Sequence, residues 1–203
     1  MNDAGERLSF PDHEARLPWL ATLLQMYHLT DGGVHEGIRR EEKQGRELAC
    51  GRGCSTCCRT HTTIPVYPIE LMGLYWYVSE QMEPSRREQL RERLEAHEKG
   101  QPCPFLIDEV CSVHPLRPMA CRNFNVFGQR CAEGEDAYYS RRGDVLTPLK
   151  KPMDEAFDLM LAFHGLKEKG ERRRALKAGR QHAYAQVLQE CNWASLLQQM
   201  QKI

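Results

Sequence analysis

The sequence lacks an excess of charge of either sign. Its 28 lysine and arginine residues balance 28 aspartate and glutamate residues, so the formal net charge is zero. A chain that binds nucleic acid through its overall charge is strongly basic. We therefore expect no nucleic-acid partner. The basic stretch RRRALKAGR at residues 172–180 is interpreted as the solvent-facing side of a helix.

The sequence also lacks a long apolar run. Its most apolar stretch, IELMGLYWYV at residues 69–78, is far shorter than the roughly 20 residues that a membrane-spanning helix needs. Residues 1–10 contain two acidic side chains and no apolar run, unlike a secretory signal. We expect a soluble, cytoplasmic protein without a membrane partner. Neither common glycine-rich pattern for nucleotide binding is present.

Cysteine, by contrast, is abundant. Nine are present, and eight of them lie between residues 50 and 131. These are Cys50, Cys54, Cys57 and Cys58 in CGRGCSTCC, Cys103 in PCPFL, Cys111 and Cys121 in CSVHPLRPMACRNF, and Cys131 in GQRCAEG. Disulfides are rare in a reducing cytoplasm, so such a cluster indicates metal binding or redox chemistry. A catalytic thiol is the least favoured alternative, because it needs one activated cysteine beside a base.

We predict that all eight clustered cysteines are metal ligands. None lies in a segment with a strong helical period, and short loops allow several thiolates to converge. Zinc binds four sulfurs in a tetrahedron, and iron-sulfur clusters use the same ligand. Gly51 and Gly53 suit a tight turn among the first ligands. Cys191 lies in a helical pattern far from the cluster and is expected to be a buried structural thiol.

Other polar residues flank the predicted ligands. Four thiolates around one zinc ion leave a net charge of about −2, which nearby cations would stabilise. Four arginines lie within a few residues of the cysteines and could serve: Arg52, Arg59, Arg117 and Arg122. His61 and His114 could replace a thiolate or donate a hydrogen bond to one. We interpret both as neighbours of the site rather than ligands.

The adjacent pair Cys57 and Cys58 raises a question about the number of centres. Neighbouring side chains point to opposite faces of an extended chain and are about 100° apart on a helix. Two adjacent thiolates therefore do not readily share one metal ion. We expect the pair to diverge, either into two centres or into one cluster and a neighbouring thiol.

These motifs resemble a known family. In the order CGRGCSTCC, TIPVYPIELMGL, CPFL and HPLRPMACRNF, they are similar to the YkgJ-type cysteine-cluster proteins, which are zinc- or iron-chelating domains with a CxxCxxCC signature. The resemblance covers residues of about 48–131, with one departure, because three residues rather than two separate Cys50 from Cys54. The resemblance implies metal binding. Some relatives are associated with lysine methylation of flagellin, which keeps an enzymatic activity open.

The fold is expected to be mostly α-helical, with a single helical domain and an irregular cysteine-rich loop region that forms the metal site. We divide it into N-terminal helices (1–47), a cysteine-cluster region (48–135) and C-terminal helices (136–203) packed on the same domain. Helical periods begin near residues 12, 68, 84 and 152, and DGG at 31–33 is expected to end the first helix. Residues 100–150 are expected to be loop, and 171–200 to hold one or two helices.

Together these features predict a metal-binding protein that holds an iron-sulfur cluster, of the 4Fe-4S kind, or zinc. Iron-sulfur is favoured over zinc because there are more clustered cysteines than the four that one zinc ion needs. Two alternatives stay open. One is a metal-dependent enzyme for redox chemistry or protein methyl transfer, with an unknown substrate. The other is a zinc-stabilised interaction module whose unknown partner is a protein or RNA.

Overall fold

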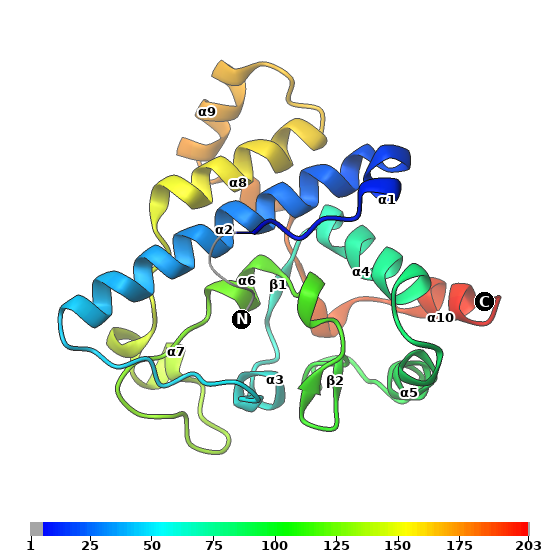
Figure 1. Cartoon of the computed structure of the whole chain (residues 1–203), viewed down its shortest axis with the longest axis horizontal. Coiled ribbons are helices and arrows are strands. Elements are labelled where there is room, and N and C mark those ends of the chain that lie inside the picture. Colours follow the sequence, from blue (N-terminus) through cyan, green and yellow to red (C-terminus); the bar gives the residue numbers. More distant parts are fainter. Residues whose placement is uncertain (1–5, 203) are drawn as a thin grey trace.

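The computed structural model describes residues 6–202, and it confirms the prediction of a mostly helical protein (Figure 1). The α-helices are α1 (Pro11–Arg16), α2 (Pro18–Lys43), α3 (Thr56–Thr60), α4 (Pro68–Glu80), α5 (Pro84–Glu95), α6 (Met119–Asn123), α7 (Ala137–Ser140), α8 (Lys150–Phe163), α9 (Lys169–Lys177) and α10 (Ala194–Met200). Short 3-10 helices are η1 (His114–Leu116), η2 (Arg142–Asp144), η3 (Arg180–Tyr184) and η4 (Leu188–Glu190). Two antiparallel pairs join β1 (Pro65–Val66) to β4 (Gln186–Val187), and β2 (Leu106–Ile107) to β3 (Val110–Cys111).

Helix α2 is the longest element and lies along α8 (Figure 1). The expectation that DGG at 31–33 ends a helix is wrong, because α2 continues through it to Lys43. Packing gives the reason. A Cβ on Gly33 would lie 2.8 Å from the Cβ of Pro152 on α8, and one on Gly37 would lie 3.0 Å from Leu146. The missing side chains therefore allow close approach to the chain at and before α8.

Helix α4 begins at Pro68, as predicted, with proline in its first turn. Leu74, Trp76 and Val78 are buried in the core, and Tyr75 and Tyr77 are partly buried against it. Glu70 is completely buried near the start of the helix. It accepts a hydrogen bond from the backbone N–H of Tyr67 at 3.0 Å and one from Met119 at 2.7 Å. One carboxylate thus ties α4 to the start of α6.

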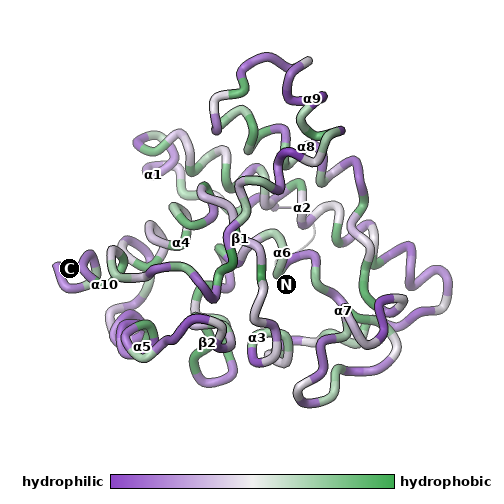
Figure 2. The backbone as a smooth tube through the Cα atoms, turned by 180° about the vertical axis from the view of Figure 1, so that it is seen from behind, coloured by the Kyte–Doolittle hydropathy of each residue, from purple (hydrophilic) through white to green (hydrophobic). Residues whose placement is uncertain are grey.

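One hydrophobic core joins the two ends of the chain to the cysteine-bearing segment. It runs from Leu20 on α2 to Met200 on α10 and includes Phe105 and Leu116 from the middle of the chain. Helix α5 contributes its buried residues Leu90 and Leu94 to this core. In Figure 2 hydrophobic stretches mark β1 and the inner helices, whereas α5 and α9 are largely hydrophilic.

Residues 100–150, expected to be loop, contain short regular elements that place cysteines. The β2–β3 hairpin turns at Asp108 and Glu109, which both have positive φ (49° and 60°), as a two-residue hairpin turn requires. Helix α6 carries Cys121. Five-residue helices such as α6 show no detectable period in the sequence, which is why the expectation of loop missed them.

Between α9 and α10 the chain is less helical than expected. Gly179 adopts a left-handed conformation (φ 69°) after α9, and η3, β4 and η4 follow before α10. Cys191 comes directly after η4, outside an α-helix, and it is only half-buried. The expectation of a buried thiol on a helix is therefore wrong for Cys191.

Candidate metal centre

Helix α3 lies at the middle of the cysteine region and carries Cys57 and Cys58. The preceding turn holds Cys54, whose backbone N–H donates to the carbonyl of Gly51 at 3.1 Å. Gly53 has a φ of 81°, a conformation that glycine adopts without strain, so the predicted tight turn is present. The backbone N–H of Cys103 donates to the carbonyl of Cys58 at 2.9 Å, which brings a distant loop against α3.

Four of the eight clustered cysteines pack in or against the main hydrophobic core, as Cys191 does outside the cluster, and we call these four the inner cysteines: Cys58, Cys103, Cys111 and Cys121. Cys103 is only 5% exposed. A hydrogen bond with the thiol of Cys103 is the largest cause that raises the pKa of Cys58, to about 12. Burial raises the pKa of Cys111 and, more strongly, that of Cys121.

The remaining four clustered cysteines are not part of the packing of the main core, and we call them the outer cysteines: Cys50, Cys54, Cys57 and Cys131. Cys50 and Cys131 pack against a separate small cluster that contains Val126 and Val145. The backbone N–H of Val126 donates to Sγ of Cys50 at 3.2 Å. Cys54 is exposed, so this side of the region faces solvent.

The charges that act on each thiol also relate the outer cysteines to one another. Burial raises the pKa of Cys50, and the nearby charges of Cys54, Cys57 and Cys131 add to that effect. Burial also raises the pKa of Cys131, where Cys54 and Cys57 act in the same direction. The structure thus places the eight clustered cysteines in one neighbourhood, in which their charges act on one another, and the ligand set stays a prediction.

Cys57 and Cys58 do not diverge completely. A hydrogen bond with the thiol of Cys58 is the largest cause that raises the pKa of Cys57. Their other neighbours differ, because the thiol of Cys58 also bonds with that of Cys103 whereas Cys57 lies near Cys50. The charge of Cys57 also acts on inner cysteines, including Cys121. Cys57 therefore lies at the boundary between the two groups.

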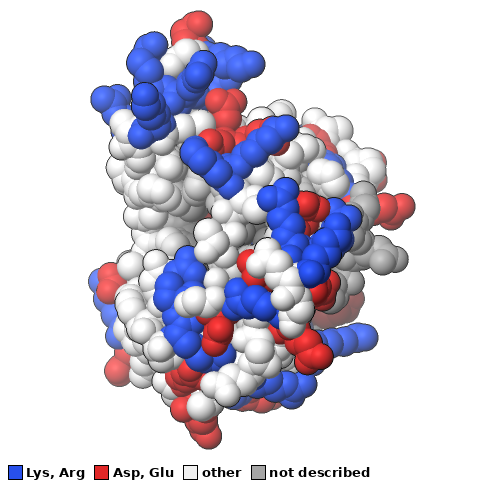
Figure 3. Space-filling model, turned by 90° about the vertical axis from the view of Figure 1, so that its left-hand side faces the viewer, with Lys and Arg blue, Asp and Glu red and all other residues white. Residues whose placement is uncertain are grey.

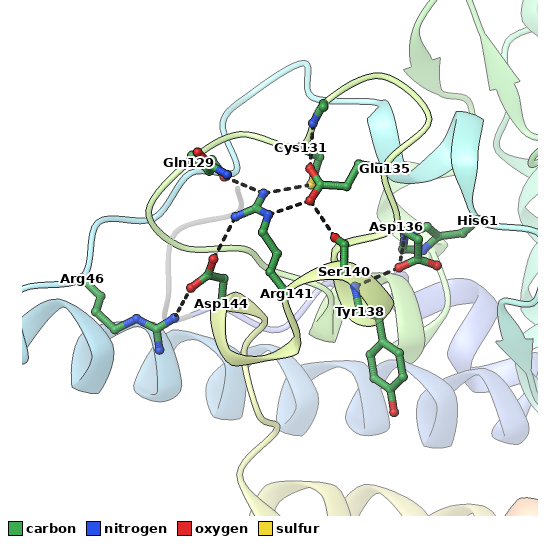
Figure 4. A network of polar contacts seen from close by, with 11 residues as sticks. Arg46, His61, Gln129, Cys131, Glu135, Asp136, Tyr138, Ser140, Arg141 and Asp144 are labelled. Carbon is green, nitrogen blue, oxygen red and sulfur yellow. Dashed lines mark hydrogen bonds and ion pairs between the residues drawn. The ribbon is translucent and has the colours of Figure 1, made fainter.

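Arg141 is a cation of the outer side that the sequence did not single out. Its guanidinium donates to Glu135 at 2.8 Å, to Asp144 at 3.1 Å and to the carbonyl of Gln129 at 2.8 Å (Figure 4). One of its nitrogens lies 3.8 Å from Sγ of Cys131. These contacts hold a positive charge against that sulfur.

The same network reaches helix α2. The Arg141 hydrogen bond lowers the pKa of Glu135 to about 2, so this carboxylate stays charged and keeps its partner. On the other side, Asp144 accepts a hydrogen bond from Arg46 at 3.4 Å, and Arg46 also pairs with Glu41 on α2 at 2.7 Å (Figure 4). The loop that carries Cys131 is therefore anchored to the end of α2.

On the inner side, Arg122 is the buried cation. It is 7% exposed and donates to Asp31 on α2 at 2.6 Å and to the carbonyls of Pro115 and Arg117. Its guanidinium also lies 4.0 Å above the ring of Tyr27. Arg122, like Arg117, lowers the pKa of Cys111. Two of the four arginines expected near the ligands therefore act on a thiol.

The other two predicted arginines have different surroundings. Arg59 forms hydrogen bonds with Ser55 and with Glu109 at the tip of the β2–β3 hairpin. It thus joins α3 to the hairpin that carries Cys111. Arg52 is exposed.

The two candidate histidines have polar partners other than thiols. His61 lies 3.2 Å from Asp136 and meets the ring of Phe124 edge-on. Burial lowers its pKa, while Asp136 opposes that shift. His114 lies 2.5 Å from a nitrogen of Arg117, and burial lowers its pKa to about 4. That both histidines are neighbours of the site rather than ligands stays a prediction.

The donor set fits a thiolate-bound metal. Within residues 6–202, no three histidine, cysteine, aspartate or glutamate side chains converge as a ready-made metal group, so the structure does not show the predicted metal site itself. Thiolates are the ligands that zinc and iron-sulfur clusters take. Backbone N–H groups and arginines that can stabilise bound thiolates are present at Cys50 and Cys131. None of the nine cysteines is in a disulfide, so each thiol is available.

The basic segment on α9 lies away from the cysteines. Lysine and arginine side chains gather at the top of the molecule, where α9 lies (Figure 3). Arg172 donates to Asp158 on α8 at 2.8 Å and to the carbonyl of Leu166. At least this arginine anchors α9 to α8. Across residues 6–202, no helix is both long and apolar enough to cross a bilayer.

Comparison with known proteins gives one match. Residues 49–144 match the model of the CxxCxxCC family, described as "Putative zinc- or iron-chelating domain". The matched range contains all eight inner and outer cysteines and excludes Cys191. No curated protein and no solved structure matches the chain.

Proposed function

We propose that this chain holds an iron-sulfur cluster or zinc through its clustered thiolates, because residues 49–144 match the model of the CxxCxxCC family. The proposed ligands are Cys50, Cys54, Cys57, Cys58, Cys103, Cys111, Cys121 and Cys131. One observation carries the proposal. Segments far apart in the sequence meet around α3, where the charges of these eight thiols act on one another, and this proximity supports the proposal.

Residues around the thiols would position the ligands and balance their charge. The N–H of Val126 and the guanidinium of Arg141 contact outer sulfurs, and Arg117 and Arg122 lower the pKa of Cys111. Hydrogen bonds and cations of this kind stabilise bound thiolates and tune a redox centre. An iron-sulfur cluster, when bound, would supply electron-transfer chemistry, and zinc would stabilise the loops.

The test is the metal content of protein purified without oxygen. Iron, zinc and acid-labile sulfide are measured per chain, and sulfide in proportion to iron indicates an iron-sulfur cluster. We expect Cys191→Ser to keep the full metal content and Cys58→Ser to lose metal. A wild-type chain that holds neither metal after anaerobic purification and after reconstitution would overturn the proposal. Equal losses in both variants would also overturn it.

A further inference from the structure

We propose that the eight cysteines form two neighbouring four-thiolate centres rather than one. The outer centre would consist of Cys50, Cys54, Cys57 and Cys131, and the inner centre of Cys58, Cys103, Cys111 and Cys121. This inference rests on the proposed function and adds to it which thiols share a metal. It also assigns the two centres different exposure to solvent.

Packing separates the two groups. Cys58, Cys111 and Cys121 pack against the main core, of which Cys103 is a member. Cys50 and Cys131 instead pack against the small cluster of Val126, Ala137 and Val145. Six of the eight thiols thus lie in two different apolar surroundings, while Cys54 is exposed and Cys57 belongs to neither cluster.

Different structural supports hold the two groups. On the outer side, an isolated bridge pairs Val126 with Val145, and the N–H of Val126 donates to Cys50. Arg141 contacts Cys131. On the inner side, the β2–β3 hairpin carries Cys111, and α6, whose first N–H donates to Glu70, carries Cys121. Each side therefore has its own anchors.

The adjacent cysteines on α3 divide the set. Neighbouring residues on a helix are about 100° apart, so one helix turn can present thiols to two sides. The thiol of Cys58 has a hydrogen bond with that of Cys103, an inner cysteine, and one with that of Cys57. The charge of Cys57 acts on the outer Cys50 and Cys131 and also on the inner Cys111 and Cys121, so Cys57 is the thiol that either group could take. Assigning Cys57 outward gives each group four thiols, which is the number that one zinc ion or one iron-sulfur cluster binds.

The two centres differ in exposure, which makes them distinguishable. Cys54 of the outer group is exposed, whereas Cys103 of the inner group is 5% exposed. A chelator should therefore remove the outer metal first.

Timed alkylation of the wild-type holoprotein tests the partition without a mutation. A chelator and iodoacetamide are added together, samples are quenched at intervals, and mass spectrometry measures modification at each cysteine. We expect the four outer cysteines to react together in a first phase and the four inner ones in a later phase. Cys191 serves as the internal control, because its rate should not depend on the chelator. A single common rate for all eight cysteines, or phases that mix the two groups, would overturn the proposal.

Metal counts in serine variants test the same partition independently. We expect Cys54→Ser to lose one part of the metal and Cys121→Ser to lose the rest, with the double variant losing both parts. Cys54→Ser combined with Cys131→Ser should lose no more than Cys54→Ser alone. Loss of all metal, or of none, in soluble Cys54→Ser would overturn the proposal. Because Cys121 packs against the core, Cys54→Ser and the alkylation phases decide the outcome if Cys121→Ser does not fold.

These outcomes also separate the partition from the proposed function. A wild-type chain without metal defeats the proposed function and with it the partition. Metal that is bound by all eight thiols but lost in one step defeats the partition alone.

Discussion

Different interactions stabilise the helical frame of α2, α4 and α8 and the cysteine-bearing segment, which consists of residues 49–61 and 100–144. In the frame, side chains such as Leu20, Leu74 and Met160 are completely buried and pack against one another. In the cysteine segment, ion pairs such as that of Arg141 with Glu135 and tight turns hold loops that bear thiols. Apolar burial stabilises the frame, whereas the segment combines buried side chains such as Phe105 and Leu116 with loops whose ordering costs entropy that polar contacts must help to offset.

Metal removal should separate the two regions most strongly. A structural zinc site contributes on the order of 10 kcal/mol to folding, so we expect chelation to lower the melting temperature by more than about 10 °C. Residues 100–135 should become sensitive to protease while the circular dichroism of the frame helices persists. An apoprotein that melts and is digested like the holoprotein would contradict this expectation.

A core substitution in the frame should lower the stability of the fold and leave the metal content unchanged. Leu20 is 0% exposed on α2, and Leu20→Ala should reduce the free energy of unfolding by about 2–5 kcal/mol through lost burial and a cavity. The metal content of the folded protein should not change. Met72→Ala is the matched control, because Met72 is exposed on α4. Chemical denaturation measures both variants, and a loss of metal in folded Leu20→Ala would show that the regions are not separable.

Glu70 connects the two regions, and its titration should be visible in stability. Burial raises its pKa to about 7 from an ordinary value of 4.5, so the folded protein binds this proton more tightly than the unfolded chain does. Folding therefore loses stability as the pH rises from 4.5 to 7, by roughly 3 kcal/mol, and changes no further above that range. Glu70→Gln does not titrate and should lack this dependence.

The measurement is the difference in unfolding free energy between wild type and Glu70→Gln at several pH values. That difference cancels effects of other titrating groups, including the thiols. Glu80→Gln, at the end of the same helix, is the control. A wild-type and Glu70→Gln difference that stays constant from pH 4.5 to 7 would contradict the raised pKa.

The smallest effect is expected on α9. Arg173 and Arg174 are exposed, and unlike Arg172 they have no hydrogen bond to α8 among the described contacts. Arg173→Glu combined with Arg174→Glu should leave nucleic-acid retention at background and metal content unchanged. Filter binding at low and moderate salt is the measurement. Salt-sensitive binding in wild type that the variant loses would instead indicate a nucleic-acid surface.

Local patterns allowed much of the frame to be predicted. Prolines at 68 and 84 start α4 and α5, and the apolar spacing of α5 predicted its buried Leu90 and Leu94. The continuity of α2 through 31–33 could not be predicted this way. Gly33 and Gly37 are small because of partners more than 100 residues away, and a local pattern contains no information about Pro152 or Leu146.

The candidate site was predicted by residue type but not by surroundings. Cysteine spacing separated the eight clustered thiols from Cys191, and the structure brings those eight together. Arg141 and Glu70 were missed, since their roles depend on contacts with Cys131 and Met119. The position of Arg141 ten residues after Cys131 was the only available signal, and no local signal relates Glu70 to residue 119.

Helix α2 also fixes the relative direction of two acidic residues, Asp31 and Glu41, that anchor the cysteine segment. Asp31 pairs with Arg122 on the inner side. Glu41 pairs with Arg46, which also pairs with Asp144 in the outer network. A helix turns by about 100° and rises 1.5 Å with each residue. One residue inserted or deleted between these acids would turn one anchor away from its partner. The ten residues from Asp31 to Glu41 thus fix the distance and the relative direction of the two anchors. The number of residues in this interval is therefore constrained even at positions where the side chain is free to vary.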